Sequence, residues 1–338
     1  MSSSRFDALS DWAARLHQLP PERLALTPAG GDASFRRYFR LTLPSGESRI
    51  LMDAPPAQED SRPFLAIARQ WDAEGLPVPT VHAHDLNQGF LELDDLGETP
   101  LQLTFDEAER RSLQRHTQAL AILADLQNRA DPSPLPHYDA ALLERELDLF
   151  PDWCLEHWLG IAPPETWPAL RQALIESALA QPQVTVHRDF DAMNLMLHRE
   201  RLYMIDFQDA VAGPVSYDLV SLLRGRYLRF STAQFQQLVD AFHSQALRDG
   251  RLPATLGLAD FLTTVNAMAA QRSLKVLGIF CRLTLRDGKT GYMARLPHFL
   301  DHLQDSLGAL PVHSDFHAWT EHTLRPALQQ RLARENER

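Results

Sequence analysis

The chain has 338 residues, of which 44% are hydrophobic and 23% are charged, so it has an ordinary globular composition and enough length for two cores. Its formal net charge of −11 argues against a nucleic-acid partner, because binding to phosphates requires clustered lysine and arginine. No apolar run reaches the roughly 20 residues of a membrane-spanning helix, and the first residues lack the apolar core of a signal peptide. We therefore expect a cytoplasmic protein with no membrane partner.

The first 95 residues predict a small α+β lobe with an antiparallel sheet. Helical periodicity covers residues 6–18, and short apolar runs between turn residues indicate strands. The expected strands cover residues 24–26, 35–43, 48–53, 81–86 and 90–94. A second helix is expected between Ser61, which can cap it, and Gly75, which can end it.

The turn between the first two strands is a candidate phosphate-binding loop. It contains Gly30 and Gly31, and Ser34 and Arg36 follow them. Glycine permits close approach of the main chain, so such a turn can place backbone N–H groups over a phosphate chain. Taken alone, an ordinary hairpin explains Gly-Gly equally well.

Residues 96–338 predict a larger, mainly helical lobe. Its first helix is expected to begin with a capping box at Thr104 and to end near Asn128. Further helices are expected at 139–159, 165–180, 217–229, 233–248, 258–282 and 315–334. The predicted domains are therefore residues 1–95 and residues 96–338, and the predicted class is α+β.

The most informative stretch covers residues 184–206. An apolar run ends before His187, Asp189 and Asn194, and two further apolar runs joined by a polar turn lead to Asp206. Such a hairpin would bring Asp189, Asn194 and Asp206 together. One carboxylate can orient an attacking hydroxyl while an amide oxygen and a second carboxylate hold Mg²⁺, so the pattern indicates phosphoryl transfer.

These residues resemble the aminoglycoside phosphotransferase-like kinase family. The resemblance is carried by residues 187–194, 205–209 and 213–219. It implies a bilobal fold like that of protein kinases, with ATP and Mg²⁺ as cofactors. It also implies that Asp189 is catalytic and that Asn194 and Asp206 bind the metal ion.

The same resemblance implies further roles for residues near the nucleotide and the catalytic loop. His187 would brace the loop, and Asp218 would accept hydrogen bonds from the loop backbone. The nucleotide would contact the glycine turn and the hinge at the end of the last strand, at Gly30, Gly31, Ser34, Arg36, Glu92, Leu93 and Asp95.

Within the family, residues 51–56, 187–223 and 271–280 are similar to those of members that act on cell-wall amino sugars. This similarity implies ATP-dependent phosphorylation of the anomeric C1 hydroxyl of N-acetylmuramate and N-acetylglucosamine in cell-wall recycling, with no obligatory protein partner. The residues expected to bind the sugar are polar or aromatic and lie in four segments: Glu156, His157, Asp191, Arg224, Tyr227, Gln271 and Arg272.

One feature departs from the family pattern. Met52 stands where these kinases usually have a phosphate-binding lysine, and the chain has only two lysines, Lys275 and Lys289. The candidate replacements are Arg36, Arg37, Arg40 and Arg49. Two alternatives therefore stay open: a kinase for another alcohol, such as an aminoglycoside, choline, ethanolamine or homoserine, and a nucleotide-binding pseudokinase.

Overall fold

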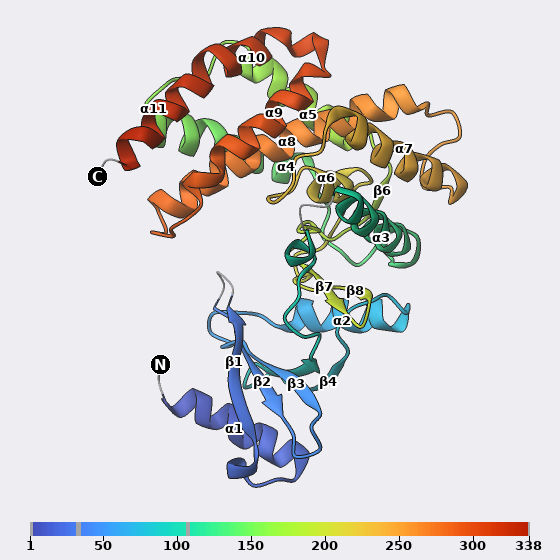
Figure 1. The fold of residues 1–338 in the computed structure, drawn as a ribbon, viewed down its shortest axis with the longest axis vertical. Coiled ribbons are helices and arrows are strands. Elements are labelled where there is room, and N and C mark those ends of the chain that lie inside the picture. The colour runs from blue at the N-terminus through green and yellow to red at the C-terminus, as the bar shows by residue number, and fades with distance from the viewer. Residues whose placement is uncertain (1–2, 32–34, 106–108, 337–338) are drawn as a thin grey trace. The chain divides into compact units, whose positions relative to one another are not determined.

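The computed structural model describes residues 3–31, 35–105 and 109–336, and it divides into two compact units (Figure 1). The first unit contains Met1–Thr104 and Met193–Asp209, and the second contains Phe105–Ala192 and Ala210–Arg338. The domains predicted from the sequence, residues 1–95 and 96–338, stay a prediction. No helix among the described residues has both the length and the apolar character needed to cross a membrane.

The first unit is built on a five-stranded antiparallel sheet with the strand order β1-β2-β3-β5-β4. The strands are β1 (Ala25–Gly31), β2 (Arg37–Thr42), β3 (Ser48–Asp53), β4 (Val81–Asp85) and β5 (Phe90–Asp94). Two helices accompany them, α1 (Ser3–His17) and α2 (Arg62–Ala73). The small antiparallel lobe predicted from the sequence is confirmed.

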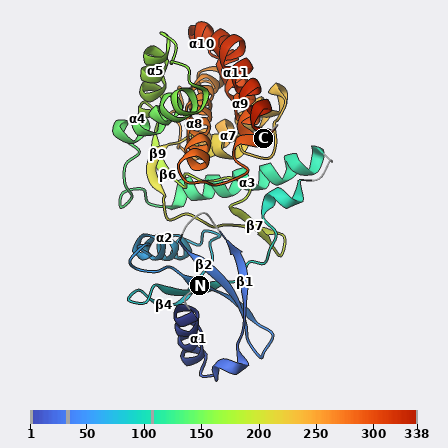
Figure 2. The ribbon, with the colours of Figure 1, turned by 90° about the vertical axis from the view of Figure 1, so that its left-hand side faces the viewer.

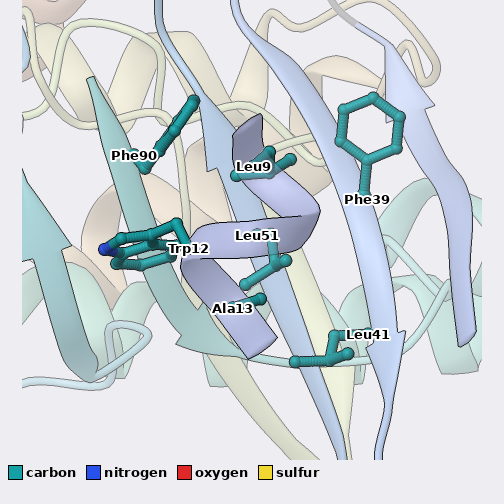
Figure 3. Packing of buried hydrophobic residues seen from close by; sticks show 7 residues of the cluster. All are labelled: Leu9, Trp12, Ala13, Phe39, Leu41, Leu51 and Phe90. Atoms are coloured by element: carbon teal, nitrogen blue, oxygen red, sulfur yellow. The ribbon is translucent and has the colours of Figure 1, made fainter. Parts of the chain in front are cut away.

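Helix α1 covers one face of this sheet through an apolar core that Figure 3 shows at close range. Leu9 and Trp12 of α1 pack against side chains of β2, β3 and β5, and the ring of Trp12 lies 5.8 Å from that of Phe90. Side chains alternate between the two faces of a strand, so Met52, next to the core residue Leu51, faces the other side, where it is fully buried.

A short hairpin, β7 (Leu195–His198) and β8 (Arg201–Met204), belongs to the first unit. The N–H of Leu197 donates to the carbonyl of Thr99, and the N–H of Met204 donates to that of Pro77, both at 2.8 Å. Directly after β8, the ring of Phe207 stacks on Phe64 of α2 at 4.9 Å. These contacts explain why the hairpin groups with the sheet.

The second unit is mainly helical, as predicted. Its regular elements are α3 (Glu109–Arg129), α4 (Ala140–Leu149), α5 (Trp167–Leu179), β6 (Gln183–Val186), β9 (Val211–Pro214), α6 (Tyr217–Leu223), α7 (Thr232–Arg248), α8 (Leu258–Leu285), α9 (Leu296–Gly308), α10 (Ser314–Trp319) and α11 (Arg325–Asn336). The long helix α8 is buried along most of its length and contacts α4, α5, α6, α7 and α9 (Figure 2). Strand β6 pairs with β9 in a two-stranded sheet.

Several helix boundaries differ from the prediction, each for a local reason. The helix predicted over 139–159 is α4 followed by a π-helical segment, Phe150–Leu159, because Pro151 lacks the N–H that an α-helix requires there. The helix predicted over 217–229 ends at Leu223, before Gly225. The helix predicted over 315–334 is interrupted by a π-helical segment at Thr320–Leu324.

Three further points concern a helix that was not predicted, a capping box outside the described residues and a residue outside its predicted strand. Helix α9 was not predicted; Pro297 lies in its first turn, where proline is tolerated. The capping box predicted at Thr104 includes Asp106 and Glu107, which lie outside the described residues. Phe35, predicted to be in a strand, lies before β2 with an exposed side chain.

Candidate active site

The loop after β6 carries Asp189 and is held by two backbone hydrogen bonds to one buried carboxylate. The N–H groups of His187 and Arg188 donate to the two oxygens of Asp218, at 2.6 and 3.1 Å. Asp218 lies in the first turn of α6, and its hydrogen bonds are those predicted for a residue that supports the loop. Arg188 has a φ of 73°, a left-handed conformation that is costly for a residue other than glycine, so contacts on both sides must hold it.

A buried ionic cluster holds the side chain of Arg188. Its guanidinium and the ammonium of Lys275 both lie 2.8 Å from the same oxygen of Glu146. The hydroxyl of Tyr138 donates to the other oxygen, and the ammonium of Lys275 also donates to the hydroxyl of Tyr217 at 2.8 Å. Burial opposes ionisation of Glu146, but Lys275 and Arg188 outweigh it and hold the pKa of this carboxyl below its usual value. Helices α4 and α8 thus fix the residue that precedes Asp189.

The charges around Asp189 favour its ionised form. Burial alone would raise its pKa, but the positive charges of Arg272 and Lys275 outweigh burial and lower the pKa below its usual value. Asp218 behaves in the opposite way, because its complete burial raises its pKa to about 7 against the effect of its hydrogen bonds. At neutral pH, Asp189 is therefore a carboxylate that can accept a hydrogen bond from a hydroxyl group.

The residues predicted to bind the metal ion flank the β7–β8 hairpin: Asn194 precedes β7, and Asp206 follows β8. The N–H of Ile205 donates to the carbonyl of Asn194 at 3.0 Å, which brings the residue before Asp206 next to Asn194. Asn194 is buried, and Asp206 has a φ of 63°. Amide and carboxylate oxygens are ligands that Mg²⁺ prefers, so this pair fits the predicted ion. Asp189 belongs to the other unit, and its convergence with Asn194 and Asp206 stays a prediction.

Arg36 is the candidate arginine that lies beside Asp206. A terminal nitrogen of its guanidinium is 4.0 Å from Asp206, and the other is 3.5 Å from Glu59, which precedes α2. The other candidates pair with different acids: Arg37 with Asp53, Arg40 with Asp95 and Glu98, and Arg49 with Glu47. Arg36 is therefore the candidate with a position next to a predicted metal ligand.

The remaining nucleotide-binding candidates are only partly described. Gly30 and Gly31 are the last residues of β1, not a turn as predicted, and Gly30 has a φ of 67°, a conformation that favours glycine. The pairing of β1 with β2 shifts register just before Gly31, and Ser34 lies outside the described residues. Glu92 and Leu93 lie in β5, an interior strand that pairs with β3 and β4, so their main-chain groups serve the sheet. Asp95 follows the strand, and its carboxylate accepts a hydrogen bond from Arg40 at 2.6 Å.

Among the predicted sugar-binding residues, Asp191 lies next to Asp189 in space as well as in sequence. Its N–H donates to the carbonyl of Asp189 at 2.8 Å, and its buried carboxylate lies 3.6 Å from Arg226. Arg272 and Gln271 are also buried near this loop: Arg272 donates to the hydroxyl of Tyr217 at 3.4 Å. The side-chain amide oxygen of Gln271 is buried and has no hydrogen-bond partner in the described structure.

The other four sugar-binding candidates are placed differently. Arg224 is buried and directed toward Asp305 of α9, at 3.0 Å, with its guanidinium 4.1 Å from the ring of Phe235. Tyr227 lies beneath the guanidinium of Arg295, at 5.4 Å. Glu156 and His157 are exposed on the π-helical segment, and within the described residues neither has a hydrogen bond or ion pair to the loop of Asp189.

Three residues near Asp189 were not identified from the sequence. Glu146 had a usable signal, since it is a charged residue between Leu143 and Leu147 on the buried stripe of α4. Lys275 had a weaker one, as one of two lysines in the chain. Arg226 had no such signal, because nothing in the sequence distinguishes it from the neighbouring polar residues as a residue near Asp189.

The chain is similar in sequence to known phosphotransferases. The sequence profile described as "Phosphotransferase enzyme family" matches residues 25–255. The N-acetylmuramate/N-acetylglucosamine kinase of Pseudomonas putida is 40% identical over 291 residues, which are 85% of this chain and 85% of that protein. The protein of the same description from Neisseria meningitidis is 39% identical over 303 residues, 88% of this chain and 89% of that protein.

Two solved structures share the fold. A choline/ethanolamine kinase family protein from Mesorhizobium loti superposes with a TM-score of 0.61 at 16% identity, covering 96% of this chain and 99% of the other. An ADP-bound aminoglycoside phosphotransferase, APH(2'')-Ib, superposes with a TM-score of 0.57 at 15% identity, covering 90% and 97%. The bilobal fold predicted from the sequence is confirmed.

Proposed function

This chain belongs to the phosphotransferase enzyme family, and we propose that it uses ATP and Mg²⁺ to phosphorylate the anomeric C1 hydroxyl of N-acetylmuramate and N-acetylglucosamine in cell-wall recycling. The observation that carries the proposal is the identity of about 40%, over 85% of the chain, to a protein described as a kinase for these two sugars. Family membership implies a nucleotide phosphate donor. The choice of ATP and Mg²⁺ is part of the proposal.

The metal ion would be held by few protein ligands. Among the described residues, no group of three or more His, Cys, Asp and Glu is arranged to hold a metal. Magnesium commonly takes one or two protein ligands together with phosphate oxygens and water, so Asn194 and Asp206 are sufficient. The bound ion would neutralise charge on the phosphates, and Arg36, next to Asp206, would take the part of the absent lysine.

The role of Asp189 follows from its charge state. As a carboxylate at neutral pH, it would accept a hydrogen bond from the C1 hydroxyl and direct its oxygen toward the γ-phosphate. An anomeric hydroxyl is more acidic than other sugar hydroxyls, so a weak base such as Asp189 is adequate. The hydrogen bonds from His187 and Arg188 to Asp218 would keep this carboxylate in place.

The proposed acceptor is a small molecule, and the surroundings of Asp189 suit a sugar. The buried groups near it are of mixed charge: Asp191 is an acceptor, Arg272 is a donor, and Gln271 can be both. Aminoglycosides are polycations and call for a mainly acidic lining, which this set is not. Since an ATP-dependent kinase requires a compartment that supplies ATP, the proposal places the protein in the cytoplasm, without nucleic-acid, membrane or obligatory protein partners.

The test is a phosphorus NMR assay with ATP, Mg²⁺ and each of the two sugars, alongside aminoglycosides, choline, ethanolamine and homoserine. We expect sugar 1-phosphates, with loss of the reducing end, and no product after chelation of Mg²⁺. Asp189→Asn should bind ATP normally but lower turnover by a factor on the order of 10² to 10⁴. Asp287→Asn, which removes an exposed carboxylate paired with Arg286, is the matched control.

Three outcomes separate the alternatives. Phosphorylation of another alcohol in preference to both sugars would support the general alcohol kinase. ATP binding without turnover on any acceptor would support the pseudokinase. Full activity in Asp189→Asn would contradict the assigned catalytic residue.

A further inference from the structure

The two proposed substrates differ by one charged group. N-acetylmuramate has a lactyl ether on C3 that ends in a carboxylate, and N-acetylglucosamine has a hydroxyl there. The reacting hydroxyl on C1 belongs to the same ring, so a residue that recognises the carboxylate must lie within one sugar's width of Asp189. A partly exposed arginine is the residue type that suits this role best.

Most arginines near Asp189 in the second unit are already committed to other contacts. Arg188 pairs with Glu146, Arg224 pairs with Asp305, and the buried Arg272 contacts Tyr217. A substrate carboxylate could bind one of these arginines only by displacing the partner that the arginine already contacts.

Arg226 differs from them. Its side chain is 26% exposed, and its Nε lies 3.6 Å from the buried carboxylate of Asp191. Among the described residues its two terminal nitrogens have no hydrogen-bond partner. Asp191 in turn donates its N–H to the carbonyl of Asp189, so Arg226 stands two contacts from the catalytic residue.

The segment that carries Arg226 is fixed. The carbonyl of Gly225 accepts hydrogen bonds from His298, at 2.9 Å, and from His302, at 3.1 Å, both on α9. A β-carbon at Gly225 would lie 3.0 Å from the carbonyl oxygen of Ser221 and 3.3 Å from the carboxylate of Asp191, so glycine permits this close approach. These contacts fix the main chain at Gly225, directly before Arg226.

We propose that Arg226 binds the lactyl carboxylate of N-acetylmuramate through its terminal nitrogens while Asp191 holds its Nε. This inference rests on the proposed function and adds a specificity-determining residue to it. It also accounts for the use of both sugars: with N-acetylglucosamine, the guanidinium keeps its ion pair with Asp191, so no partly buried charge is left without a partner.

The test compares kcat/KM for the two sugars in the full-length protein. Arg226→Gln should lower kcat/KM for N-acetylmuramate about 10- to 100-fold more than for N-acetylglucosamine, the range expected for a charge-assisted hydrogen bond. Arg226→Lys should give an intermediate ratio, because it keeps the charge but not the planar fork. Arg286→Gln removes the same charge after the end of α8 and should leave the ratio unchanged.

A change in the substrate tests the same contact without relying on the stability of a variant. Converting the lactyl carboxylate to its carboxamide should lower kcat/KM in the unmodified protein and should have no effect in Arg226→Gln. If kcat/KM falls by the same factor from acid to amide in both proteins, Arg226 does not bind the carboxylate and the inference is wrong. If the unmodified protein phosphorylates neither sugar, the proposed function fails and the inference fails with it.

Discussion

Replacing Glu146 with Gln is the sharpest test of how the loop of Asp189 is held. The substitution keeps the shape of the side chain and removes its charge. Glu146 is buried on α4 and pairs with both Lys275 and Arg188 at 2.8 Å, so Glu146→Gln leaves two cations without their carboxylate. Lys275 is the more affected of the two, because its ammonium is almost completely buried.

The expected cost follows from this burial. Breaking a buried ion pair by removing one partner costs about 3–5 kcal/mol, because the other charge remains buried. Arg188 is about a quarter exposed and can be partly hydrated, so we expect the lower end of that range, about 3 kcal/mol. Adding Lys275→Met removes the uncompensated ammonium, so the double variant should recover about 2 kcal/mol relative to the sum of the single effects.

The free energy of unfolding is measured by urea denaturation followed by circular dichroism, which reports mainly on the helical second unit. Turnover is measured in parallel, because Arg188 adopts a left-handed conformation next to Asp189. Loss of the Glu146 carboxylate, which pairs with Arg188, should lower kcat about tenfold, with little change in KM for ATP. Asp148→Asn, on the same helix, breaks a partly exposed pair with Arg171 and should cost about 1 kcal/mol or less.

Additivity would refute this reasoning. If the effects of Glu146→Gln and Lys275→Met sum to that of the double variant within about 0.5 kcal/mol, the two residues are not coupled as the structure indicates. An unchanged kcat in a folded Glu146→Gln variant would show that the cluster stabilises the unit without positioning Asp189.

Three further predictions use other parts of the structure. Asp218 has a folded pKa of about 7 against about 3.9 when unfolded, so its contribution makes the free energy of unfolding fall as pH rises from about 4 to about 7. The difference in free energy of unfolding between the unmodified protein and Asp218→Asn should therefore be larger at pH 4 than at pH 7. Equal differences at the two pH values would contradict the argument from burial. Arg36→Met should raise KM for ATP about tenfold and Arg36→Lys much less, by steady-state kinetics, whereas equal effects would mean that the charge beside Asp206 is not used. Gly278→Ala should lower the free energy of unfolding in urea by about 1–3 kcal/mol, because a β-carbon would lie 2.3 Å from the backbone of Leu149. Gly308→Ala is the control and should lower it little, because the nearest neighbour of its β-carbon would be 3.6 Å away.

The local sequence pattern was sufficient to predict most of the secondary structure and the phosphoryl-transfer motif. Strand and helix periodicity predicted the antiparallel lobe and most of the helices, because each pattern records which side of a local element is buried. The spacing of His187, Asp189, Asn194 and Asp206 predicted phosphoryl transfer, since the chemistry requires these side chains at fixed intervals along one loop and hairpin. The relevant neighbours in these cases are close along the chain.

Only the tertiary structure decided the pairings between distant segments. Four arginines were candidates to replace the absent lysine, and the fold places Arg36 beside Asp206 while Arg37 and Arg40 pair with other acids. It also joined Glu146 to Lys275, 129 positions further along, and Arg226 to Asp191. The physical reason is that a charge finds its partner through space, and the helices and sheets that set those distances are positioned by packing that no local pattern records.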